Sequence, residues 1–165
     1  MATLSTEPKN EVVTVLRARL TDYNSARRPD PNWILPDFPI LKLVKDSYPL
    51  IRVTDITETA EIIDIARNMK YIARLQIDVW VWHGIDGSDK QIIAISGVNY
   101  SGQKLLDMVS RDIISALDTN KSDFDDDTNI LHNFKLLAHV NSGKDPDRKQ
   151  LLRKRIEISY EYYRG

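Results

Sequence analysis

The most regular pattern in the chain is an alternation of apolar and other residues over residues 71–82. Every odd-numbered position there is apolar: Tyr71, Ala73, Leu75, Ile77, Val79 and Val81. This period of two is typical of a β-strand with one buried face, because successive side chains of a strand point to opposite sides. We therefore predict a strand, roughly 40 Å long at the usual rise per residue, whose odd-numbered face covers the core.

The even-numbered face of this strand changes along its length. It begins with the polar residues Arg74, Gln76 and Asp78 and ends with Trp80 and Trp82. Tryptophan and arginine are enriched in protein–protein interfaces, but tryptophan is also common in buried clusters. The face is therefore either a contact surface or a second small core beneath loops.

Two further segments have the apolar spacing of amphipathic helices. In residues 8–23 the apolar side chains recur every three or four positions: Val12, Leu16, Leu20 and Tyr23. In residues 103–117 they form a continuous stripe: Leu105, Leu106, Val109, Ile113, Ala116 and Leu117. Charged and hydroxyl side chains occupy the other face of each segment. Both segments are predicted to be helices that bury one side.

The remaining patterned segments are shorter. Residues 49–53 and 91–95 predict short strands, and residues 134–140 and 152–162 predict two strands joined by a turn. Residues 57–68 fit a short helix, a loop or a bent strand. The order of helix, strands, helix and strands predicts a single α+β domain over residues 1–165, with an antiparallel or mixed β-sheet and two main helices packed on its one apolar face.

A proline-rich stretch at about residues 24–49 interrupts this pattern. It holds five of the seven prolines, which excludes a helix there, together with the aromatic residues Trp33 and Phe38. One interpretation is an extended loop held to the core by its aromatic side chains. The other is an arm that docks on a neighbouring subunit.

Composition narrows the class of protein. The chain has no cysteine, so disulfides, thiolate metal sites and a cysteine nucleophile are excluded. The formal net charge of −1 argues against a protein that coats DNA. The first residues lack the pattern of a signal peptide, and no apolar run approaches the roughly 18 residues of a membrane span. We expect a protein of the cytoplasm, or of a particle assembled there, without membrane contact.

Searches for catalytic chemistry in the sequence give no match. The three histidines, His83, His132 and His139, have no metal-ligand spacing. Asp123, Asp125 and Asp127 alternate as in a calcium loop, but Thr128 and Phe134 stand where that loop needs glycine and glutamate. No phosphate-binding loop is present. We predict no catalytic residue, no cofactor and no metal site.

The aromatic residues at the end of the chain complete a candidate interface. The last predicted strand ends in Tyr160, Tyr162 and Tyr163. With the even-numbered face described above, they form a candidate surface for subunits or partners: Arg74, Gln76, Asp78, Trp80, Trp82, Tyr160, Tyr162 and Tyr163. An assembling or docking protein is therefore favoured over an enzyme.

Two short motifs resemble a known family. Residues 74–81 (RLQIDVWV) are followed, about 25 residues later, by residues 105–113 (LLDMVSRDI). This pair is similar to the middle of phage tail-terminator and tail-completion proteins. The segments PLIRVTD at residues 49–55 and EISY at residues 157–160 also fit the layout of that family.

The resemblance implies a structural virion protein without enzymatic activity. Such proteins form rings, usually hexamers, that cap the tail tube, stop its polymerisation and meet the head-side connector or stopper protein. DNA passes through the lumen, and assembly takes place in the host cytoplasm. The acidic loop would be a lumen or electrostatic surface: Asp123, Asp125, Asp126 and Asp127. The alternatives are another connector or stopper subunit of the head–tail neck, or a small non-viral enzyme or regulatory domain.

Overall fold

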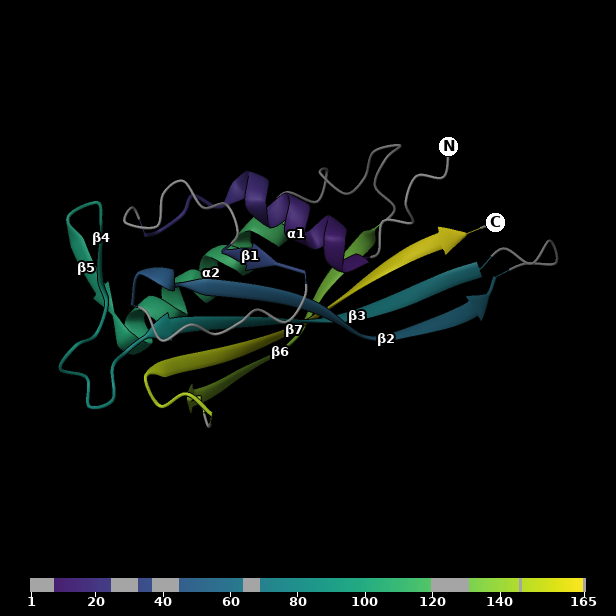
Figure 1. Cartoon of the computed structure of the whole chain (residues 1–165). Coiled ribbons are helices and arrows are strands. Elements are labelled where there is room, and N and C mark those ends of the chain that lie inside the picture. Colours follow the sequence, from purple (N-terminus) through teal and green to yellow (C-terminus); the bar gives the residue numbers. More distant parts are fainter. Residues whose placement is uncertain are drawn as a thin grey trace.

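The computed structural model describes residues 8–24, 33–36, 45–63, 69–119, 131–145 and 147–164, with the backbone alone for residues 119, 139–142, 163 and 164 (Figure 1). Its helices are α1 (Pro8–Arg19) and α2 (Gly102–Thr119), with the short 3-10 helix η2 (Lys45–Ser47). Its strands are β1 (Ile34–Leu35), β2 (Leu50–Ile62), β3 (Met69–Trp82), β4 (Ile92–Ile95), β5 (Val98–Ser101), β6 (His132–Lys144) and β7 (Leu151–Arg164).

The main sheet has five strands in the order β1-β2-β3-β7-β6. β1 is parallel to β2, and all other neighbours are antiparallel, so the sheet is mixed. The strand predicted over residues 71–82 is β3, which begins two residues earlier and lies between β2 and β7. These features confirm the predicted α+β fold.

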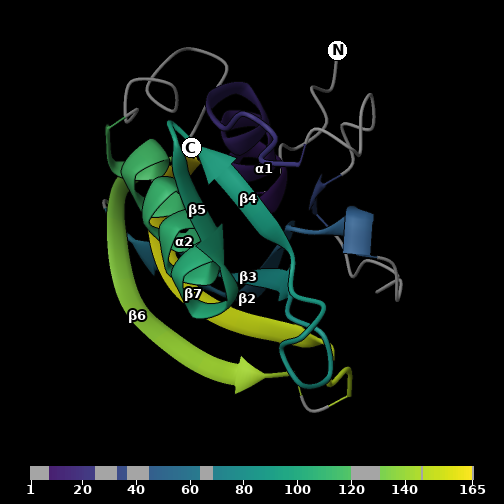
Figure 2. The same cartoon turned by 90° about the vertical axis from the view of Figure 1, so that its left-hand side faces the viewer.

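Both helices pack on one face of this sheet. α1 contacts β1, β2 and β3, whereas α2 contacts β3, β7 and β6. Figure 2 shows β6 and β7 curving past α2. The apolar stripe of α2 faces the sheet, with Leu105, Leu106, Val109 and Ile113 fully buried. Among the described residues, no helix has the length and apolar character needed to cross a membrane.

The odd-numbered side chains of β3 face the helices, as predicted. Those from residue 73 to residue 81 are all buried: Ala73, Leu75, Ile77, Val79 and Val81. β7 adds Ile158 beside Leu75 and Ile156 beside Ile77, in antiparallel register. These cross-strand pairs form the core layer against which the helices pack.

The segment with the ambiguous pattern, residues 57–68, begins as a continuation of β2. β2 extends to Ile62 and pairs with β3 as far as Met69, across a register shift that leaves Ile56 without an opposite partner. Pairing along β3 therefore outweighs the helix propensity of this segment. β2 and β3 run on beyond the helices as a hairpin (Figure 1), and their ends are joined through residues outside the described ranges.

A second, two-stranded sheet precedes α2. The predicted strand at residues 91–95 is β4, and it pairs with β5, which the sequence pattern did not predict. The two residues of the turn, Ser96 and Gly97, have φ values of 52° and 79°. Positive φ at both positions is typical of the tight turns that match the twist of a hairpin.

The proline-rich stretch is described only at residues 24, 33–36 and 45–49. Trp33 and Ile34 are buried, and the backbone amide of Ile51 donates to the carbonyl of Trp33 at 2.8 Å. The side-chain amide of Asn24 donates to the carbonyls of Asp46 and Tyr48. These parts pack on their own chain, as the loop interpretation requires, while most of the predicted arm lies outside the described residues.

Candidate functional site

Most of the residues predicted as an interface are buried within the chain itself. Asp78 is fully buried, Trp80 and Trp82 are 1% and 7% exposed, and Tyr160 and Tyr162 are each 1% exposed. A side chain that its own chain covers cannot contact a partner in the folded protein. The interface prediction is therefore wrong for these five residues.

Tyr160 and Tyr162 lie on the helix-covered face. β7 pairs with β3 so that Tyr160 is opposite Ala73 and Tyr162 is opposite Tyr71, both on the odd-numbered face of β3. The rings of Tyr71 and Tyr162 stack with centroids 4.9 Å apart. These tyrosines therefore extend the core.

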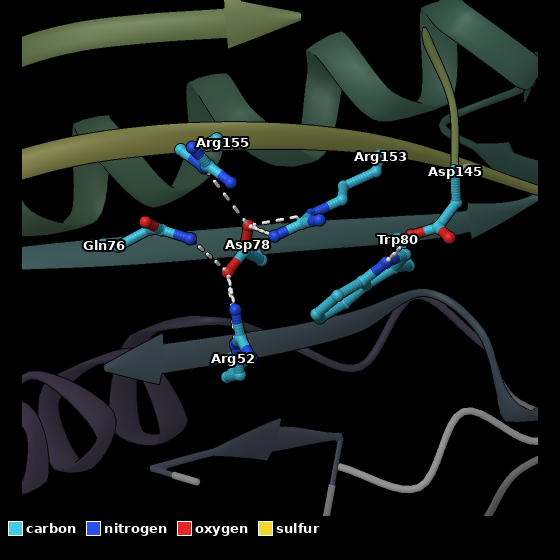
Figure 3. A network of polar contacts seen from close by, with 7 residues as sticks. All are labelled: Arg52, Gln76, Asp78, Trp80, Asp145, Arg153 and Arg155. Atoms are coloured by element: carbon cyan, nitrogen blue, oxygen red, sulfur yellow. Dashed lines mark hydrogen bonds and ion pairs between the residues drawn. The ribbon is translucent and has the colours of Figure 1, made fainter. Parts of the chain in front are cut away.

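Asp78 is the centre of a polar network on the other face of the sheet (Figure 3). Its Oδ2 accepts hydrogen bonds from Arg52 and from the side-chain amide of Gln76, the latter at 2.9 Å. Its Oδ1 accepts two from Arg153, at 3.0 and 2.8 Å. The guanidinium of Arg155 is 3.9 Å from the same oxygen. Because Arg52, Asp78 and Arg153 come from β2, β3 and β7, the network joins three adjacent strands.

Trp80 lies beneath this network. The guanidinium carbons of Arg52 and Arg153 lie 5.5 and 5.4 Å from a centroid of its ring system, a favourable cation–π distance. Its Nε1–H donates to Oδ2 of Asp145 at 3.0 Å. The other oxygen of Asp145 accepts the backbone amides of residues 147 and 148, at 2.9 and 3.0 Å. Arginines and the turn before β7 therefore bury the ring.

Trp82 is covered in the same way by neighbouring loops. Its Nε1–H donates to the carbonyl of Asp89 at 2.9 Å, and its ring lies 6.1 Å from that of Tyr48. Burial raises the pKa of Tyr48 to about 12, so its phenol stays neutral at physiological pH. The even-numbered face of β3 therefore ends in a second small core, which was the alternative to a contact surface.

The chemistry available to the Asp78 network is structural. All of its acceptor capacity is directed at guanidinium and amide donors from within the chain, so the carboxylate has no free lone pair aimed at a substrate. Over the described ranges, no group of three or more His, Asp or Glu side chains is arranged to hold a metal ion. The network fixes the register of three strands through charge-assisted hydrogen bonds.

A cavity of about 820 Å³ lies where the end of α1 meets α2 and the β4–β5 hairpin. The hydroxyl of Tyr23 donates to Asp112 at 2.8 Å in its wall. Burial, reinforced by this hydrogen bond, raises the pKa of Tyr23 above its ordinary value. Arg19 and Arg111 also line the cavity. The tyrosine is therefore held as a neutral donor and is not a base.

The remaining predicted site residues divide into two groups. Arg74 is exposed and lies 3.9 Å from Glu157 on the polar face of the sheet, and Gln76 is half-buried. They stay candidate contact residues. The side chain of Tyr163 and the acidic loop lie outside the described part of the structure: Asp123, Asp125, Asp126 and Asp127.

Surfaces that the sequence reading missed lie at the two edges of the sheet. Among the residues with a described backbone, β1 pairs with β2 at Ile51 and Arg52 alone, and β6 is the last strand on the other side. In the described structure, no strand pairs with the outer side of β2 beyond Arg52 or with the outer side of β6. Large apolar side chains on or beside these edges are 41–68% exposed: Ile56, Ile62, Ile63, Leu136 and Leu137. The sequence signal for Ile56, Ile62 and Ile63 was their presence among polar residues, whereas Leu136 and Leu137 lie in a largely apolar predicted strand, where the sequence pattern does not set them apart.

Comparisons with known proteins give little further information. No protein-family model and no curated protein matches the sequence. Among solved structures, the chain is similar to one described as "Virion of native gene transfer agent (GTA) particle", at 10% identity and a TM-score of 0.48. The similarity spans 99% of this chain and 100% of that chain. At this TM-score the likeness carries no argument about the present chain.

Proposed function

We propose that this chain is a structural protein of a tailed-virus particle, a tail terminator that caps the tail tube as a ring and joins it to the head-side connector. The observation that supports this proposal best is a mixed sheet in which, over the described residues, the outer side of β2 beyond Arg52 and the outer side of β6 are both unpaired, each with exposed large apolar side chains. Exposed sheet edges are templates for pairing with another chain, and exposed apolar groups favour association.

The sequence resemblance agrees with the centre of the fold. Residues 74–81 form the middle of β3, and residues 105–113 form the first part of α2, which packs against β3. Leu75, Leu105 and Val109 are fully buried in the layer between them. The two motifs are therefore in contact in the fold. Because they are largely buried, they account for the architecture, while the edges and loops supply the contact surfaces.

The proposed mechanism is steric and interfacial. Copies join edge to edge into a closed ring, usually of six, which blocks the end of the growing tube and offers its other rim to the connector. DNA passes through the lumen without being held. The acidic loop at residues 123–127 would face this lumen and repel the DNA backbone; unchanged DNA ejection after its aspartates are replaced by Asn would contradict that placement.

The test is the length of the tails that assemble without this protein. In the virus that encodes the chain, deleting its gene should give tubes that exceed the normal length and lack heads, because nothing stops polymerisation. Restoring the gene in trans is the control and should return tails to one length. Tails of normal length that fail to join heads would instead identify another neck protein, a connector or stopper subunit. Unchanged, infectious particles would contradict a role in assembly.

A further inference from the structure

The two free edges of the sheet carry opposite charge. The outer part of β2 and the residue after it, residues 53–63, contain three acidic residues and no basic one: Asp55, Glu58 and Glu61. β6 contains two lysines and two histidines and no acidic residue. Glu58 and Lys135 are both exposed. An acidic edge and a basic edge therefore lie on opposite sides of one sheet.

Each edge also has one exposed apolar residue at an irregularity of the strand. The register of β2 against β3 shifts at Ile56, and that of β6 against β7 shifts at Leu137. These side chains are 43% and 42% exposed. Bulges and charges usually protect a strand edge from unwanted pairing, and apolar side chains at such positions weaken that protection. Each edge therefore combines unpaired backbone groups, which can hydrogen-bond to another strand, with one exposed apolar side chain.

Charge of a single sign on each edge selects between possible pairings. Two acidic edges repel one another, and so do two basic edges, because like charges directly opposite in a sheet are destabilising. An acidic edge beside a basic edge is favourable. The pattern therefore disfavours a symmetric dimer made through one edge and favours contact between unlike edges of two copies.

The strand directions permit this contact. β2, β3, β7 and β6 alternate in direction, so β2 and β6 of one chain run antiparallel to each other. A second copy placed alongside with its strands in the same orientation brings its β2 next to the β6 of the first. The resulting pair of β2 and β6 from two copies is antiparallel, as are the pairs β2–β3, β3–β7 and β7–β6 within one chain. The free outer side of β2 beyond Arg52 runs from Val53 to Ile62, ten of the 13 residues of that strand, and β6 has 13 residues to pair with it.

We propose that the acidic edge of β2 in one copy pairs with the basic edge of β6 in the next, which extends the sheet from subunit to subunit. This inference rests on the proposed ring function and names the surface that builds the ring. The contact joins two different surfaces of identical chains, and such a heterologous contact closes into a ring when the rotation between copies allows it. Ionic attraction across exposed edges should weaken as salt is raised.

The experiment exchanges the charges of the two edges. The first variant, Asp55→Lys with Glu58→Lys, replaces two of the three acidic residues of the β2 edge by lysine, which makes this edge basic, and it leaves the ion pair between Glu61 and Lys70 in place. The second variant, Lys135→Glu with Lys144→Glu, makes the β6 edge acidic. Each variant then has two edges of the same sign. The matched control, Lys90→Glu with Lys104→Glu, changes exposed residues outside the main sheet by the same charge as the second variant.

The expected results concern the mass of the purified protein, measured by light scattering over a range of concentrations. The wild type and the control should form the same oligomer. Each edge variant alone should raise the apparent dissociation constant of assembly at least about tenfold, since like-charge contacts at interfaces cost several kcal/mol. An equimolar mixture of the two variants should assemble again, because the basic β2 edge of one fits the acidic β6 edge of the other.

Three outcomes would overturn the inference. Variants that assemble as well as the wild type would show that the ring, if it forms, uses another surface, and the proposed function would stand. Failure of the mixture to assemble would show that charge does not select the pairing. A wild type that stays monomeric at every concentration would also refute the edge contact. The tail-length phenotype of the deletion then decides the proposed function independently.

Discussion

Replacing Trp80 by Ser is expected to lower the free energy of unfolding by about 4 kcal/mol, the usual loss when a large buried aromatic side chain is removed. Trp80 is 1% exposed, lies beneath two guanidinium groups and donates to Asp145. The change leaves a cavity and removes a partner from a buried carboxylate. Adding Trp82→Ser should prevent folding altogether, because a loss of this size approaches the whole stability of a typical domain. Chemical denaturation followed by circular dichroism measures the effect.

The control for the Trp80 variant is Ile62→Ser. Ile62 is 68% exposed near the end of β2, so its replacement should change the free energy of unfolding by no more than about 0.5 kcal/mol. A Trp80→Ser chain with wild-type stability that fails only in assembly would contradict the structure and restore the tryptophans as a contact surface.

Replacing Asp78 by Asn is expected to lower the free energy of unfolding by about 3 kcal/mol, near the lower end of what breaking a buried ion pair costs. The carboxylate is fully buried, and the Arg52 side chain is only 8% exposed. Asn keeps the shape but leaves two guanidinium groups without their counter-charge. The lower end applies because the Arg153 side chain is 20% exposed and water can replace part of its interaction. Thermal and chemical unfolding of the purified variant measure the loss.

The control for the Asp78 variant is Asp107→Asn. Asp107 also pairs with a cation, Lys154 at 3.2 Å, but its side chain is 54% exposed. Exposed ion pairs contribute little, so this change should cost about 0.5 kcal/mol or less. Equal effects of the two substitutions would mean that Asp78 does not hold the three strands together.

Periodicity predicted the elements whose pattern is strongest and could not predict what covers a strand. The alternation over residues 71–82 and the stripe over residues 103–117 correspond to β3 and α2. Alternation shows which side chains share a face of the strand. The groups that bury Trp80 and Asp78 come from Arg52 and Arg153, which are 26 and 75 residues from Asp78 in the chain. Only the register between strands brings them together.

The tyrosines near the C-terminus show a different error. Tyr160 and Tyr162 alternate in step with Ile156 and Ile158, and a period of two puts all four side chains on one face of the strand. Their assignment to an interface relied on the general enrichment of tyrosine in interfaces. The local pattern was the stronger signal, because one register of β7 against β3 fixes the face of all four side chains.

The free edges could not be found from the sequence because they depend on strand order. Residues 57–62 had no decisive pattern, and they form a strand since β3 offers a partner along their whole length. Which strands end at the sides of the sheet is set by pairing between segments that are distant in the chain, such as β3 with β7. The charges of the two edges were readable in the sequence, but their place in the fold was not.

The central claim, that this chain forms a ring at the head-proximal end of a viral tail, is tested most directly by cryo-electron microscopy of particles from the genome that encodes it. The account predicts a ring of copies between the tail tube and the connector, usually six copies of the 19.0 kDa chain, with β2 of each copy beside β6 of the next. A map that places the chain elsewhere, or particles that contain none of it, would contradict the account.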